Sequence, residues 1–105
     1  MSIETPAKFK GKEAFYEKML RLFVKDLPES WPDFEAAVED IENVKVQVHT
    51  LKGIAGNLDV TEVYQCALQF ETSMRNGEPD RFLYHMFVDA CNDLKKALPP
   101  PEPSA

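Results

Sequence analysis

The chain contains the segment VHTLKGIAGNL at residues 48–58, and its apolar spacing predicts an amphipathic helix. At about 100° per residue, the apolar side chains in and just before this segment fall within one narrow arc. They are Val44, Val48, Leu51, Ala55 and Leu58. This arc is the predicted core stripe, and His49 lies about 140° from its centre. We therefore expect His49 to face solvent.

The predicted helix face that carries His49 combines glycines with positively charged side chains. Lys45, Lys52, Gly53 and Gly56 fall on the same exposed side. A glycine inside a helix costs about 1 kcal/mol relative to alanine, so two glycines on one face indicate that the face must stay bare. Gly53, one turn after His49, would leave room for a partner's active site above the imidazole.

An exposed histidine in this setting favours covalent phosphoryl transfer. A histidine side chain has an ordinary pKa of about 6.5, so its neutral, nucleophilic form is well populated at pH 7. Such a ring can form a covalent phosphoryl intermediate and release it again. The bound group carries about two negative charges, which the ammonium groups of Lys45 and Lys52 can stabilise. Lys52 borders the core stripe, so we expect its ammonium to reach toward the ring.

The pattern at residues 11–27 predicts a first helix that ends before Pro28. Its inward residues are predicted to be Phe15, Met19, Leu22, Phe23 and Leu27. A short second helix is expected from a Ser30 cap to about residue 41. The central helix is expected to begin at an Asn43 cap and to run to about residue 57.

Two further helices follow the central segment. Asp59 and Glu62 have capping-box spacing, which predicts a fourth helix that ends at Gly77. Pro79 and Asp80 are expected to open a fifth helix. The predicted inward residues are Val63, Ala67, Phe70 and Met74 in the fourth helix, and Leu83, Phe87, Ala90, Leu94 and Leu98 in the fifth.

Together these patterns predict an all-α fold, an antiparallel four-helix bundle with a short additional helix, because short connections favour antiparallel neighbours. We expect the bundle to occupy residues 11–98. Residues 1–10 are predicted to be a flexible lead-in. Residues 99–105, with four prolines, are predicted to be an extended, flexible tail.

Composition narrows the function. The 105 residues carry a formal net charge of -6, which argues against nucleic-acid binding. No apolar run approaches the roughly 18 residues of a membrane helix, and the first residues show no signal-peptide pattern. We therefore expect a cytoplasmic protein without direct membrane contact. We also expect a monomer.

At the central segment the sequence resembles the histidine-containing phosphotransfer (HPt) family. His49 to Gly53, followed by Ala55, Asn57 and Leu58, is similar to the family signature H-T-L-K-G-x-A-x-N-L-G. The resemblance extends more weakly over roughly residues 11–98. The first helix resembles the family's first helix at Phe15-Tyr16, Met19-Leu20 and Phe23, and the fourth resembles A-x-x-L-E-x-x-x-R-x-G at Ala67, Phe70-Glu71 and Arg75-Asn76-Gly77.

The resemblance implies a four-helix bundle with a short extra N-terminal helix, and phosphorylation of His49 at the ring nitrogen distal to the backbone. Donor and acceptor would be aspartates of response-regulator receiver domains. These partners would supply Mg²⁺, so the chain itself would need no cofactor and no metal. It would be a phosphocarrier without independent turnover, standing free or belonging to a hybrid sensor histidine kinase, and the direction of phosphoryl flow stays open.

Two positions need comment within this resemblance. The family usually has glycine where this chain has Asp59, although aspartate tolerates unusual turn geometry better than most residues. Glu71 falls where the family often places a polar residue that reaches the histidine. It would accept a hydrogen bond from the proximal ring nitrogen, or else be a solvated helix charge.

Other functions have less support. A non-phosphorylated interaction domain of the same fold is the main alternative. A metal-binding or hydrolytic enzyme would need ligands beyond His49 and His85, and the sequence offers no such spacing. We expect His85 to be structural, and Cys66 and Cys91 to be reduced core or flanking residues.

Overall fold

The computed structural model describes residues 5–98, and every regular element in this range is helical. A 3₁₀ helix, η1, covers Ala7–Phe9. The α-helices that follow are α1 (Glu13–Asp26), α2 (Phe34–Glu39), α3 (Ile41–Asn57), α4 (Thr61–Arg75) and α5 (Arg81–Ala97). The predicted all-α class is confirmed: four long helices form the bundle, and α2 is the short additional helix.

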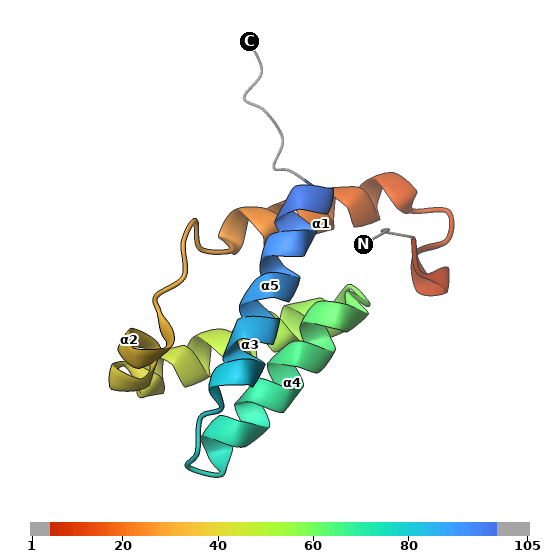
Figure 1. Ribbon diagram of the computed structural model, residues 1–105. Coiled ribbons are helices and arrows are strands. Elements are labelled where there is room, and N and C mark those ends of the chain that lie inside the picture. Colours follow the sequence, from red (N-terminus) through yellow and green to blue (C-terminus); the bar gives the residue numbers. More distant parts are fainter. Residues whose placement is uncertain (1–4, 99–105) are drawn as a thin grey trace.

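Short connections fold α3, α4 and α5 back on one another (Figure 1). At the end where α3 and α5 finish, α1 lies across the bundle. The Tyr16 hydroxyl donates a hydrogen bond to the Leu58 carbonyl at 2.6 Å, and the Lys95 ammonium donates one to the Pro28 carbonyl at 2.7 Å. At the opposite end, α2 packs beside the start of α5, where Arg81 pairs with Glu35.

Aromatic side chains fill the centre of the core. Phe70 on α4 lies between two rings of α5, with centroid distances of 5.3 Å to Tyr84 and 6.5 Å to Phe87. Trp31 approaches Phe87 edge-on at 5.4 Å. The inward residues predicted for α4 are all buried, as are Phe87, Ala90 and Leu94 of α5, whereas Leu83 and Leu98 of α5 are partly buried.

The predicted inward face of α1 is confirmed at Phe23 and Leu27, and Met19 is partly buried, but the prediction is wrong at Phe15 and Leu22. Phe15 is 53% exposed and Leu22 is 45% exposed. The buried residues of this helix are Tyr16, Leu20, Phe23 and Val24. The helix carries two overlapping apolar stripes about 100° apart. The stripe through Tyr16 faces inward because its ring packs against Phe9, with centroids 4.8 Å apart, while its hydroxyl reaches a backbone carbonyl.

Three predicted helix caps are also wrong. Asp33, and not Ser30, caps α2, accepting the Ala36 amide hydrogen at 2.8 Å. The central helix α3 begins at Ile41, so Asn43 lies inside it and its amide donates to the Asp40 carboxylate. Neither Asp59 nor a capping box starts α4, which begins at Thr61 without a side-chain cap.

The predicted start of α5 at Pro79 and Asp80 agrees with the structure, where Asp80 is the N-cap of this helix. Asp80 accepts the Leu83 amide hydrogen at 2.8 Å. Within the expected lead-in, residues Ala7–Phe9 form η1, and Phe9 packs against the core. Residues 1–4 of the lead-in and the predicted tail at 99–105 lie outside the described residues.

Candidate functional site

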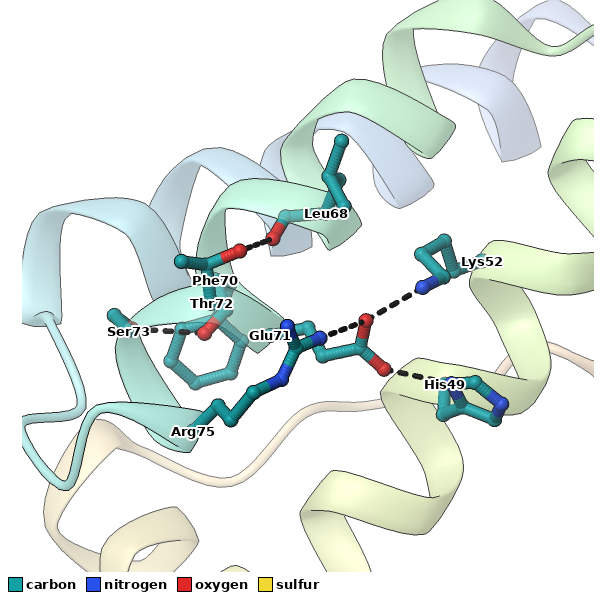
Figure 2. A network of polar contacts seen from close by, with 8 residues as sticks. All are labelled: His49, Lys52, Leu68, Phe70, Glu71, Thr72, Ser73 and Arg75. Atoms are coloured by element: carbon teal, nitrogen blue, oxygen red, sulfur yellow. Dashed lines mark hydrogen bonds and ion pairs between the residues drawn. The ribbon is translucent and has the colours of Figure 1, made fainter.

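His49 lies in the middle of α3, and its side chain is 72% exposed, as the helical wheel predicted. The five residues predicted as the core stripe are all buried, and this fixes the outward direction of the ring. The ring is nevertheless held in place, because Nδ1 lies 2.7 Å from Oε2 of Glu71 on the neighbouring helix α4. Figure 2 shows the second ring nitrogen pointing away from Glu71.

Glu71 is a buried carboxylate, with only 9% of the residue exposed. Burial alone would raise its pKa, but hydrogen bonds from Lys52 and His49 outweigh that effect and hold the pKa below its ordinary value. Glu71 is therefore ionised near neutral pH and can only accept hydrogen bonds. Nδ1 of the neutral ring must then carry the proton, which leaves the lone pair on the outward Nε2.

Lys52 contacts Glu71 rather than the histidine ring. Its Nζ atom donates to Oε1 of Glu71 at 2.5 Å, and its side chain is only 17% exposed. The sequence placed this ammonium close to the imidazole, but the buried carboxylate attracts it more strongly. Lys52 thus neutralises Glu71, so that a negative charge directly beside the ring is offset by a positive one.

Arg75 completes the network from the next turn of α4. Its Nη2 atom lies 3.3 Å from Oε1 of Glu71, and its side chain is 67% exposed (Figure 2). Arg75 belongs to the family resemblance of α4, but it was not among the predicted site residues. Its position four residues after Glu71 on a helix could have indicated the contact.

An open hollow of about 400 Å³ lies beside the imidazole. It is lined by Lys45, Val46, His49, Thr50, Glu71 and Arg75. Lys45 also pairs with Glu42 at 3.5 Å. The hollow is therefore bordered by two cations, Lys45 and Arg75, so a negatively charged group next to the ring would meet positive charge from both helices.

The two glycines of this face differ in their surroundings. At Gly53 a Cβ atom would meet nothing within 4 Å, so this position leaves the helix surface open beside His49. At Gly56 a Cβ atom would lie 3.3 Å from two ring carbons of Tyr64. The contact with Tyr64 therefore gives Gly56 a packing role besides the predicted one of keeping the face bare.

The remaining reactive side chains lie apart from this network. His85 is on α5, next to Tyr84, with ring centroids 5.7 Å apart. Cys66 and Cys91 are free and buried, and burial raises the pKa of the Cys91 thiol to about 12. Within residues 5–98, no group of three histidine, cysteine or acidic side chains is arranged to hold a metal ion. None of the helices in this range is long and apolar enough to cross a membrane.

A helical bundle that presents one oriented, solvent-facing imidazole is the architecture of a histidine phosphocarrier. Comparison with protein families supports this class: the model of the Hpt domain matches residues 18–98, most of the chain. The protein therefore belongs to the Hpt domain family, whose members are histidine phosphotransfer domains of phosphorelays and have no independent turnover. Searches of curated proteins and of solved structures gave no match.

Proposed function

We propose that His49 is the phosphoacceptor of this domain and that Nε2 is the reacting atom. The hydrogen bond between Nδ1 and Glu71 carries this proposal, because it leaves the Nε2 lone pair directed into solvent. That nitrogen attacks the phosphorus of an aspartyl phosphate, the bond from phosphorus to the carboxyl oxygen breaks, and aspartate leaves. The ring becomes cationic as the new bond forms, and the Glu71 carboxylate beside Nδ1 stabilises that charge.

The partners in this proposal are receiver domains of response regulators, one as donor and another as acceptor. The chain contributes an accessible nucleophile and positive charge on the borders of the hollow. Arg75 and Lys45 are placed to attract the transferring group, whereas Lys52 acts through Glu71. Mg²⁺ is contributed by the receiver, and the chain works as a cytoplasmic monomer, either free or as part of a hybrid sensor kinase.

Transfer of label from a phosphorylated receiver tests the assignment. We expect acid-labile, base-stable label on His49, the stability pattern of a phosphoramidate bond. The variant His49→Gln should take up no label and keep the helical content of the wild type, because the side chain is largely exposed. The matched control is His85→Gln, which should be labelled like the wild type. Label that survives in His49→Gln would contradict the proposal.

A further inference from the structure

Tyr64 on α4 occupies an unusual position, and its chemistry is not used by the network around Glu71. The ring lies against the backbone of α3 at Gly56, where a Cβ atom would approach two ring carbons to 3.3 Å. Glycine inside a helix costs about 1 kcal/mol relative to alanine. The chain accepts this cost at a position where the missing Cβ leaves room for the edge of an aromatic ring.

The ring of Tyr64 is on the same face of the bundle as the histidine. Tyr64 and Glu71 are seven residues apart on α4, and seven residues correspond to nearly two full turns, so both point in almost the same direction. Gly56 and His49 have the same spacing on α3. Two parallel rows therefore run along this face, with the Tyr64–Gly56 pair about 10 Å from the Glu71–His49 pair.

That distance places Tyr64 inside the area a partner must cover. A standard interface buries about 800 Å² on each protein, which as a disc centred on His49 has a radius of about 16 Å. Tyr64 is partly buried, and no described residue forms a hydrogen bond with its hydroxyl. Aromatic side chains, tyrosine among them, are enriched at protein interfaces and among the residues that dominate binding energy, and the ring supplies most of their contact area.

We infer that Tyr64, laid across Gly56, is a docking contact for the receiver domain and contributes to the affinity of the phosphorelay complex. This inference rests on the proposed function, because the receiver is the partner that must approach His49. Tyr64 touches no reacting atom. It should change how tightly a receiver binds, and it should leave the reactivity of the imidazole unchanged.

The test compares binding with intrinsic reactivity. A panel of purified receiver domains is loaded with acetyl phosphate, and the fastest donor is used for transfer kinetics. Tyr64→Ala should raise the KM for this donor about five- to tenfold with little change in kcat, the loss expected for an interface anchor. Tyr64→Phe retains the ring and should stay within about twofold of the wild type. Phe82→Ala, at an exposed aromatic residue of α5, is the matched control and should change nothing.

Two further measurements separate docking from packing. Labelling of His49 by phosphoramidate, which needs no receiver, should be equal in the wild type and Tyr64→Ala. Gly56→Ala should also raise KM by displacing the ring, and this effect should disappear in the Tyr64→Ala background.

Several results would overturn the inference: an unchanged KM in Tyr64→Ala, an equal loss in Tyr64→Phe, a parallel loss of phosphoramidate labelling, or a Gly56→Ala effect that persists without the ring. A wild-type chain that accepts label from no receiver would overturn the proposed function, and the docking role with it.

Discussion

At the scale of single residues, Glu71 sets the chemistry of the site. One carboxylate oxygen accepts from Nδ1 of His49, and the other accepts from Lys52. The first contact selects the tautomer whose nucleophilic nitrogen faces a partner. The second supplies the positive charge that keeps the carboxylate ionised despite its burial. A neutral side chain in place of Glu71 could still accept the hydrogen bond from Nδ1, but it could not balance the positive charge of Lys52.

Glu71→Gln should therefore lower stability and slow transfer without abolishing it. The amide oxygen can still accept from Nδ1, but the Lys52 ammonium is left largely buried without its counter-charge. We expect a loss of roughly 1–3 kcal/mol in the free energy of unfolding, measured with urea at pH 7. Transfer from a phosphorylated receiver should slow several-fold. Glu42→Gln, at a glutamate whose side chain is 85% exposed, is the control and should do neither.

Glu71→Gln should also change how the stability of the domain depends on pH. The pKa of Glu71 is lower in the folded protein than its ordinary value, so the ionised form stabilises the fold. This contribution is complete above the ordinary glutamate pKa of about 4.3 and is lost as pH falls through the lower folded value. The stability difference between wild type and Glu71→Gln should therefore shrink below about pH 4.3. A difference that stays constant down to pH 2 would contradict the assignment.

At the scale of elements, the end of α3 depends on one strained residue. The Val60 amide bonds to the Ala55 carbonyl and the Asp59 amide to the Gly56 carbonyl, which is the pattern of a Schellman motif. Asp59 adopts a φ of 54°, in the left-handed region that favours glycine. The same motif ends α4, where Gly77 takes the equivalent place.

Asp59→Gly should consequently stabilise the domain. Glycine removes the steric cost of the left-handed conformation, about 1 kcal/mol for a residue with a short polar side chain. The substitution also removes an exposed ion pair with Lys8 at 3.3 Å, which contributes less than about 1 kcal/mol. We expect a net gain of up to about 1 kcal/mol in urea unfolding, whereas Asp59→Ala should destabilise. A less stable glycine variant would show that the ion pair outweighs the strain.

The helices differ in how far the sequence could predict their buried faces and their contacts. The stripe of α3 was unambiguous, because one apolar arc stands opposite a charged face, and the exposure of His49 followed from it. In α1 two apolar stripes overlap, and the tertiary contacts of Tyr16, with the Phe9 ring and with the Leu58 carbonyl, select between them. The contact between Lys52 and Glu71 joins residues 19 positions apart on two helices, so no periodicity within one helix could reveal it.

At the scale of the whole molecule, α1 determines how the bundle is closed. A hydrogen bond from the Tyr16 hydroxyl anchors α1 to the carbonyl of Leu58, which lies 42 residues away, just after the end of α3. The ring of Tyr16 is buried, and Phe9 of η1 packs on it. This contact lies at the end of α3, away from the turn that carries His49. Closure of the bundle and chemistry at the site can therefore be changed separately.

Tyr16→Phe tests this separation. The ring and its packing remain, but the Leu58 carbonyl loses its buried donor, which costs about 1–2 kcal/mol. Thermal unfolding should shift down by about 4–8 °C for each kcal/mol, while transfer to His49 stays at the wild-type rate. Tyr64→Phe is the matched control, because no described residue bonds to its hydroxyl, and its Tm should not move. Equal Tm values for wild type and Tyr16→Phe would mean that α1 is held by its apolar side chains alone.

The Tyr16 phenol should also make stability depend on pH. Burial raises the pKa of this phenol, and the charge of Asp59 raises it further, so the folded state favours the protonated form. Above the ordinary tyrosine pKa of about 10, the wild type should therefore lose stability that Tyr16→Phe does not lose.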